Sequence, residues 1–346
     1  MTNAIEATDL TKTFAGKREV RALDGVSFAV EEGTVFGLLG PNGAGKTTAV
    51  RILTTILKPD SGTATVLGHD VAREANLVRT LIGLAGQYAA VDENLTGREN
   101  LTMVGRLNHL PTSFVTGRAT ELLGQFQLTD AADRPLKTYS GGMRRRLDLA
   151  AALMARPSVL FLDEPTTGLD PQSRNDLWEV IEGLVGGGTT VLLTTQYLEE
   201  ADRLASQLAV IDHGQVIAGG TPAQLKAQLG ATVLEVGLSS LEDAGRTTAV
   251  LASVGSHAPV ANGTVVEVTV DEGPQAAMEA LRSLDGQGVT PVSFTLREPS
   301  LDDVFLALTG RKTEEDGPDG GTSGGGGGGK AQAGRRGGTT TTGGAR

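Results

Sequence analysis

The residues with the clearest chemical potential form a loop from Gly40 to Thr47, where the sequence reads Gly-Pro-Asn-Gly-Ala-Gly-Lys-Thr. This spacing fits G-x-x-x-x-G-K-[ST], a loop that cradles phosphates between a buried strand and a helix. Glycines let successive N–H groups turn inward, and the helix expected to start near Gly45 adds its positive end. We expect Lys46 to contact the β- and γ-phosphates and Thr47 to ligate magnesium. The predicted nucleotide-binding residues of this loop are Gly40, Pro41, Asn42, Gly43, Ala44, Gly45, Lys46, Thr47 and Thr48.

Two carboxylates, Asp163 and Glu164, follow the apolar run from Val159 to Leu162, which is typical of a strand buried on both faces. Ligands collect at the carboxyl ends of such strands in an open α/β sheet. We expect Asp163 to hold Mg²⁺ directly or through water, and Glu164 to deprotonate the attacking water as general base. A solvated strand end is the alternative, and the nearby phosphate loop disfavours it.

Ser140, Gly141 and Gly142 form a third short motif, which alone is more typical of an ordinary turn or helix cap. Here it precedes a helical stretch from Met143 to Leu153, so it lies at a helix N-terminus where anions bind. The helix opens with three arginines, residues 144–146, which could steer phosphate or fix the helix against a partner. We expect at least two of them to form a solvated helix face.

With these motifs in this order, the chain resembles the nucleotide-binding subunit of an ATP-binding cassette (ABC) transporter. The resemblance covers one cassette and implies that Ser140, Gly141 and Gly142 form the signature loop, which contacts the γ-phosphate held by a second cassette. Tyr139 replaces the usual leading Leu, and Met143 the usual trailing Gln. Two ATP molecules are then sandwiched between two copies, most simply a homodimer, because this chain carries a single cassette.

Other site residues are implied by the same resemblance. Phe14 stacks on adenine, with a half-buried strand residue as the alternative. Gln87 reaches magnesium and the attacking water, while its loop contacts the membrane subunit. Asp170 belongs to the loop that crosses the dimer interface, and a helix cap ahead of Pro171 is a compatible role. Thus the expected metal ligands are Thr47, Gln87 and Asp163, and the expected catalytic residues are Glu164, Gln196 and Gln87.

Gln196 stands where the family usually has a switch histidine. Glutamine can donate a hydrogen bond to the γ-phosphate, but it cannot carry an imidazolium charge. We therefore expect a γ-phosphate sensor at Gln196 and turnover without a histidine-linked pH step. This substitution, the segment Tyr-Ser-Gly-Gly-Met-Arg-Arg-Arg and the end of the chain together resemble the daunorubicin-resistance subfamily of drug-export ATPases.

That subfamily resemblance implies an ATPase subunit that powers export of a hydrophobic drug or antibiotic by a separate membrane permease. Two alternatives stay open at this point: a subunit for lipid, polysaccharide or import transport, and a soluble ABC ATPase acting on ribosomes or DNA. The single cassette and the lack of sustained heptads disfavour the soluble reading.

These residues are positioned by strands and helices that alternate up to about residue 220, so we predict an α/β fold, a P-loop cassette with a RecA-like core. Residues 1–229 form the predicted cassette, in which about 88–157 lack strand patterning and form a helical subdomain. Residues 230–310 are predicted to be a small α+β domain of ferredoxin-like type, with strands at 232–236, 264–270 and 289–296 and a helix at 275–284. The Gly-rich residues 311–346 are expected to be a disordered tail.

A last helix is expected after its cap, Ser300, with an apolar stripe formed by Leu301, Val304, Phe305 and Leu308. This stripe is expected to dock on its own small domain or on a partner. In the drug-export subfamily a similar ending is associated with assembly onto the permease.

Composition agrees with a subunit on the cytoplasmic face of the membrane, attached through its permease. The 346 residues contain no cysteine and carry a formal net charge of −11, which argues against sequence-independent binding of nucleic acid. No apolar run approaches the roughly 20 residues that span a bilayer, and the first residues lack the pattern of a signal peptide. The four histidines are scattered and are not expected to bind zinc.

Overall fold

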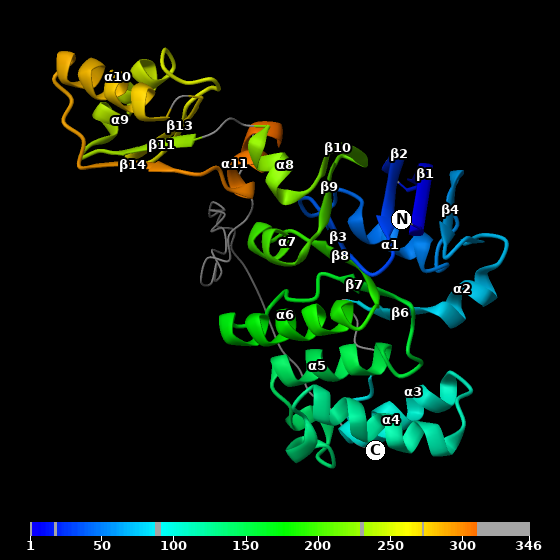
Figure 1. The fold of residues 1–346 in the computed structure, drawn as a ribbon. Helices are drawn as coiled ribbons and strands as arrows, with labels where there is room; N and C mark the ends of the chain where they lie inside the picture. Colours follow the sequence, from blue (N-terminus) through cyan, green and yellow to red (C-terminus); the bar gives the residue numbers. More distant parts are fainter. Residues whose placement is uncertain (1, 17–18, 87–90, 229–231, 272, 310–346) are drawn as a thin grey trace, which may run out of the picture. The chain divides into compact units, whose positions relative to one another are not determined.

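The computed structural model describes residues 2–16, 19–86, 91–228, 232–271 and 273–309. Figure 1 shows the helices and strands of these ranges, coloured in chain order. No helix in those ranges is long and apolar enough to cross a membrane. The predicted Gly-rich tail, residues 311–346, lies outside the described residues. The division of the chain at residues 229 and 310 stays a prediction.

A six-stranded sheet forms the centre of the nucleotide-binding part, in the order β10-β9-β3-β8-β7-β6. All neighbours in it are parallel except β9 and β10. The strands are β3 (Val35–Leu39), β6 (Ile82–Ala85), β7 (Val159–Asp163), β8 (Thr190–Thr195), β9 (Gln207–Asp212) and β10 (Gln215–Gly220). Every residue of β3, β7 and β8 is buried, as the apolar runs in β3 and β7 predict. Because β8 lies between β3 and β7 and all three are parallel, the phosphate loop, the Asp163–Glu164 pair and Gln196 lie at the same edge of the sheet. Figure 1 labels the three strands.

An antiparallel sheet in the order β2-β1-β4-β5 lies beside this core. Its strands are β1 (Asn3–Phe14), β2 (Val20–Glu31), β4 (Ser61–Val66) and β5 (His69–Asp70), and α1 (Lys46–Leu53) and α2 (Ala75–Leu81) belong to the same part of the chain. One apolar cluster joins β1 and β2 to α1 and to the parallel strands, for example through Ile5, Ile52 and Phe161. The first helix is therefore packed between two sheets, which fixes the loop that precedes it.

The helical subdomain contains α3 (Gly97–Leu107), α4 (Thr112–Gln125) and α5 (Gly141–Ala152). Thr96 is the N-cap of α3 and forms a capping box with Glu99. Its hydroxyl accepts from the Glu99 N–H group, and the Glu99 carboxylate accepts from the Thr96 N–H group. The predicted helical character is confirmed, while the boundaries at 88 and 157 stay predictions. Two further helices, α6 (Pro171–Gly186) and α7 (Leu198–Leu204), follow the strands β7 and β8.

The small domain has the order β12-β13-β11-β14, and all of its pairs are antiparallel. Its elements are β11 (Thr232–Gly237), α9 (Leu241–Leu251), β12 (Val260–Asn262), β13 (Val265–Val270), α10 (Gly273–Gly286) and β14 (Ser293–Arg297). This βαββαβ sequence with that strand order is the ferredoxin-like arrangement that the sequence predicts. The sequence prediction missed α9 and β12, and it placed the last strand four residues too early at its start.

The apolar stripe of the last helix, α11 (Leu301–Thr309), packs onto the cassette rather than onto the small domain. Leu301, Val304 and Phe305 are buried in one cluster with residues of α7, such as Leu198, and with Leu225 of α8 (Pro222–Ala227). The predicted docking of the stripe on its own small domain is thus wrong. Leu308 is 42% exposed and does not belong to this buried cluster.

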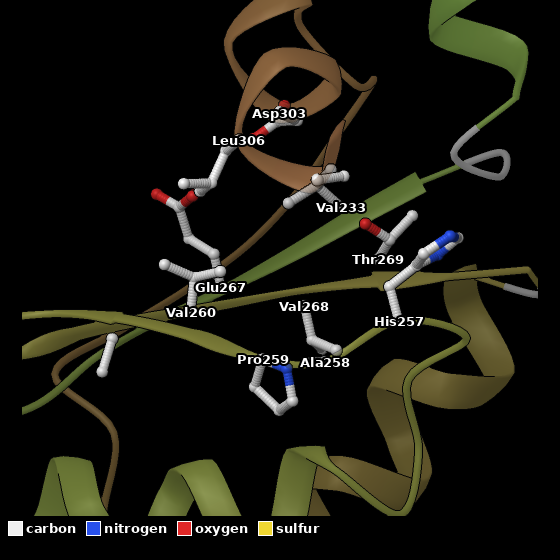
Figure 2. Close-up of a pocket in the computed structure, with 12 residues that line it drawn as sticks. Val233, His257, Ala258, Pro259, Val260, Glu267, Val268, Thr269, Asp303 and Leu306 are labelled. Carbon is white, nitrogen blue, oxygen red and sulfur yellow. The ribbon is translucent and has the colours of Figure 1, made fainter. Parts of the chain in front are cut away.

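A cavity of about 570 Å³ lies between the small-domain sheet and α11 (Figure 2). Its lining includes Val233, Glu267 and Thr269 from the sheet, with Asp303 and Leu306 from α11. Arg297, at the end of β14, donates to both carboxylate oxygens of Asp303 at 2.6 and 3.0 Å and to Glu267 at 3.4 Å. The acidic groups of this cavity are therefore already bridged by an arginine of the same chain.

Candidate nucleotide-binding site

The phosphate loop connects β3 to α1, as predicted, and its backbone admits only glycine at two positions. A Cβ at Gly40 would lie 2.2 Å from the carbonyl oxygen of Ile211, and one at Gly45 would lie 2.4 Å from that of Ala22. Gly45 also has a φ of 113°, which L side chains rarely adopt. These close contacts hold the loop against the sheet, with its N–H groups at the start of α1 available to an anion.

Lys46 is 3% exposed and lies across this loop. Its Nζ donates to the carbonyl oxygens of Gly40 at 2.7 Å and Pro41 at 3.2 Å. The same Nζ lies 3.4 Å from Oε1 of Glu164. Burial lowers the pKa of Lys46, although the carboxylates of Glu164 and Asp163 act in the opposite direction. An anionic ligand at the loop would therefore stabilise the charged form of this lysine.

Asp163 lies at the end of β7, where two hydroxyl groups converge on its Oδ1. Thr47 donates to this atom at 3.2 Å and Thr194 at 2.6 Å. Mg²⁺ prefers oxygen ligands and is commonly bound by one or two carboxylates together with substrate phosphates. The Asp163 carboxylate and the Thr47 hydroxyl fit that donor set.

Glu164 follows in the left-handed region, with a φ of 51°. Its N–H group lies 3.1 Å from the carbonyl oxygen of Thr194 and 3.0 Å from the hydroxyl of the same residue. Thr194 therefore positions both neighbouring carboxylates, Asp163 through its side chain and Glu164 through its backbone. This unusual backbone geometry at a polar site is typical of functional loops.

The signature residues begin α5, as the sequence predicts. Ser140 is the N-cap, and its Oγ accepts from the N–H group of Met143 at 3.2 Å. A Cβ at Gly142 would lie 2.6 Å from Oγ of Ser173, whereas Gly141 has open space. Across the part of the chain that the structure describes, no hydrogen bond joins these three residues to the phosphate loop. The two motifs are thus separate surfaces within one copy.

Tyr139 is buried directly before the signature. Its hydroxyl donates to the carbonyl oxygen of Ala131 at 2.7 Å. A Cβ at Gly97 would lie 2.4 Å from the Tyr139 oxygen, so glycine at the start of α3 leaves room for this ring. Burial raises the pKa of Tyr139. The substitution for the usual Leu is therefore accommodated by a matching glycine in a neighbouring helix.

The remaining predicted residues have separate positions. Phe14 ends β1 and is 41% exposed, so its ring is available for stacking. Asp170 caps α6 by accepting from the N–H and hydroxyl groups of Ser173, which lowers the pKa of Asp170. Gln196 follows β8 directly and is half-buried. Gln87 lies outside the described residues, so its predicted contacts stay predictions.

Two residues at the site were missed by the sequence prediction. Thr194, described above, gave a weak signal as a hydroxyl residue at the end of a buried strand. For Arg145 the sequence predicts only that at least two of the three arginines at 144–146 are solvated, without saying which one is not; its guanidinium contacts the loops after β6 and β7. Thr194 and Arg145 both make their contacts with segments that are distant in the sequence.

Comparison with known proteins agrees with this geometry. The family model for ABC transporters matches residues 23–167, and the model for the DrrA1-3-like C-terminal domain of ATP-binding proteins matches residues 220–309. The architecture and the site define a nucleotide-hydrolysing cassette. The chain belongs to the ABC transporter family, in the group that carries the DrrA1-3-like C-terminal domain, and it is an ATPase.

Two relatives cover nearly the whole chain. The daunorubicin resistance ATP-binding protein DrrA2 of Streptomyces coeruleorubidus is 56% identical over 90% of this chain and 96% of its own. The daunorubicin/doxorubicin resistance ATP-binding protein DrrA of Streptomyces peucetius is 52% identical over 91% and 96%. A solved ATP-binding cassette of an ABC transporter, in its ADP conformation, matches 65% of this chain and 93% of its own with a TM-score of 0.58 and 27% identity.

Proposed function

We propose that this chain is the ATP-hydrolysing subunit of an exporter that moves a hydrophobic drug or antibiotic through a separate membrane permease. The observation that carries the proposal is similarity to drug-resistance ATP-binding proteins along 90% of the chain, including the C-terminal domain. Similarity confined to the cassette would favour no cargo class. The permease holds the transported molecule, so its chemistry determines the cargo.

Nucleotide binding would begin at the phosphate loop. Backbone N–H groups at the start of α1 and the Lys46 ammonium would contact the phosphates, and Phe14 would stack on the adenine. Thr47 and Asp163 would hold Mg²⁺, together with Gln87, and the ion would neutralise developing phosphate charge. The pKa of Lys46, which burial lowers, would rise on binding because the phosphates favour its charged form.

Hydrolysis would require two copies. Ser140, Gly141 and Gly142 of one copy would contact the γ-phosphate bound by the other, with Asp170 at the interface. Glu164 would then accept a proton from the attacking water, and Gln196 would donate a hydrogen bond to the γ-phosphate. Loss of the γ-phosphate removes the contacts that hold the copies together, so the dimer reopens.

Coupling to transport would occur at the membrane surface. We place the chain at the cytoplasmic face as a peripheral subunit that contacts a multi-span permease through the loop containing Gln87. Dimer closure would move this loop and the permease with it.

The first test traps the closed dimer. Glu164→Gln keeps the size of the side chain but removes the base. The variant should bind MgATP, hydrolyse it only at a residual rate and elute as a dimer in size-exclusion chromatography. Glu242→Gln, which changes an exposed pair with Arg246 on α9, is the matched control and should behave like the wild type. A Glu164→Gln variant that stays monomeric with MgATP would contradict the proposed dimer.

The second test identifies the partner. The tagged full chain is isolated in mild detergent from membranes of its native host, with and without ATP, and co-purifying proteins are identified by mass spectrometry. Recovery of a multi-span protein supports the transporter, and drug efflux can then be measured with both subunits. Recovery of ribosomes or DNA-associated proteins without a membrane protein would favour the soluble class instead.

A further inference from the structure

Arg145 is the middle one of three consecutive arginines in α5, and it is largely buried. Its side chain is 16% exposed, whereas that of Arg144 is 37% exposed. The backbone carbonyl oxygens that accept from its guanidinium are those of Gly86 at 2.5 Å, Asp163 at 3.2 Å, Glu164 at 3.0 Å and Pro165 at 2.7 Å. Thus a residue of the signature helix donates to two loops at the carboxyl ends of β6 and β7.

The geometry of these bonds requires an arginine. A guanidinium presents five N–H donors in a fixed plane, while a lysine ammonium is a point charge with three rotatable donors. Three of the four acceptors are consecutive carbonyls around Glu164, the residue held at a φ of 51°. A non-glycine residue keeps that conformation only where its surroundings hold it.

A carboxylate beside the guanidinium offsets part of the cost of its burial. Asp148, one turn further along α5, lies 3.5 Å from Nη1 of Arg145. Burial lowers the pKa of Arg145, while the charge of Asp148 acts in the opposite direction. The arginine is therefore held as a cation inside the protein, between the signature helix and the loop that carries Glu164.

We propose that Arg145 is a positioning residue for hydrolysis: it fixes the backbone of Glu164 and ties that loop to the helix that begins at Ser140. This inference rests on the proposed function, in which Glu164 is the base and Ser140 contacts the nucleotide of the partner copy. A displacement of α5 on capture of that nucleotide then reaches the base of its own copy through Arg145. The four carbonyl oxygens that accept from Arg145 all lie outside the phosphate loop. We therefore expect nucleotide affinity to depend on other residues.

The test compares two buried arginines of the helical subdomain. Arg145→Lys keeps the charge but loses the fork, and kcat should fall roughly 10²-fold, as expected for a base displaced by about 1 Å. The KM for ATP should change less than about threefold, because Lys46 and its loop are untouched. Arg118→Gln is the control: Arg118 is 9% exposed and donates to Leu153 O and Glu121, so the variant should lower the melting temperature and leave kcat unchanged.

A double variant separates positioning from general structural support. If Arg145 acts through Glu164, Arg145→Lys should cause no further loss of residual kcat in a Glu164→Gln background, whereas independent effects would multiply. Wild-type kcat in Arg145→Lys, or multiplicative losses in the double variant, would overturn the inference. Failure of the proposed function gives another result, because Glu164→Gln alone would then hydrolyse ATP normally or stay monomeric with MgATP.

Discussion

The chain contains two clusters in which a cation meets carboxylates. Burial lowers the pKa of both cations, but the balance between burial and the neighbouring carboxylates differs. At the nucleotide site, burial outweighs Glu164 and Asp163, and the pKa of Lys46 is lowered. In the small domain, the hydrogen bonds from Arg297 to Asp303 outweigh burial, and the pKa of Arg297 is raised. Arg297 makes a bidentate bond to Asp303, but Lys46 donates mainly to backbone carbonyls and lies 3.4 Å from Glu164.

The cluster around Lys46 therefore favours the binding of an additional anion, whereas the charges of the Arg297 cluster already neutralise one another. The backbone supports this distinction, because Gly45 and Glu164 both have positive φ values at the nucleotide site. Arg297, in contrast, ends a regular strand, and Asp303 lies in the first turn of a helix capped by Ser300. Strained backbone and an incompletely compensated cation occur together where chemistry is expected.

The largest predicted effect is the difference between removing Lys46 and removing Arg297. Lys46→Ala should lower kcat/KM for ATP by roughly 10²–10³-fold or more, because a preorganised charge on the phosphates is lost. Arg297→Ala should leave kcat/KM within about twofold, because its partners are outside the nucleotide site. Steady-state ATPase measurements on both variants decide the comparison. Equal losses would show that the small-domain cluster also serves turnover.

A second effect concerns the position where a histidine is usual. Gln196→Ala should lower kcat by roughly 10²-fold if its amide donates to the γ-phosphate in the transition state. The wild-type rate should show no titration near pH 6.5, while Gln196→His should introduce one near that value. Rate profiles from pH 5.5 to 8.5 on the three proteins test this. Full activity in Gln196→Ala, or a wild-type step near pH 6.5, would contradict the assigned role.

A third effect concerns stability rather than rate. Arg297→Ala should lower the free energy of unfolding by about 1.5–3 kcal/mol, the usual range for hydrogen bonds to charged groups. Arg246→Ala, which removes an exposed pair with Glu242, is the control and should lose at most about 0.5 kcal/mol. Urea unfolding at pH 7 measures both. Equal losses would show that the Arg297 cluster is no stronger than a surface pair.

The same cluster predicts how stability depends on acid. Burial alone would raise the pKa of Asp303, but the bonds from Arg297 and Ser300 together lower it. The stability from Asp303 is therefore present above its unfolded pKa of about 3.9 and lost as pH falls through the lower folded value. Arg297→Ala should weaken this acid-dependent loss, and urea unfolding over that pH window measures it. If the free energy of unfolding of the variant depended on pH as in the wild type, Arg297 would not be the cause of that dependence.

Much of this could be predicted from sequence because it depends on local signals. The loop from Gly40 to Thr47, the strand before Asp163 and the helix after Ser140 are each specified by neighbouring residues. The docking of Val304 onto α7 and α8 was not predicted, because periodicity identifies an apolar stripe but not its partner. Arg145 was missed for a related reason: its burial depends on loops 20 and 59 positions away in the chain.

Two elements of the small domain show the same limit. The strand β12 has three residues, and only one short ladder with β13 defines it, so its sequence gives little alternation to detect. Helix α9 is amphipathic, but Gly245 and three β-branched residues weaken its helical propensity. Tertiary packing of Ala244, Val250 and Leu251 against the sheet stabilises it instead.

The smallest predicted effect concerns a buried carboxylate of the cassette and its contribution to stability. Glu200 on α7 is fully buried, and Nε1 of Trp178 donates to its Oε1 at 3.2 Å. Burial raises the pKa of Glu200, although hydrogen bonds and Arg145 oppose the shift. A raised folded pKa means that the stabilising contribution is complete below the unfolded pKa, about 4.3, and is lost as pH rises through the folded value.

Glu200→Gln keeps an acceptor for Trp178 and removes the ionisation. Its stability should therefore vary less with pH, and at pH 8 it should exceed that of the wild type by about 1 kcal/mol, a typical size for one substitution. Glu199→Gln, on the exposed side of the same helix, is the control and should change neither property. Urea unfolding from pH 5 to 8 measures all three proteins. A less stable Glu200→Gln at every pH would contradict the prediction, because it would show that the carboxylate stabilises the fold through its second acceptor oxygen or its charge.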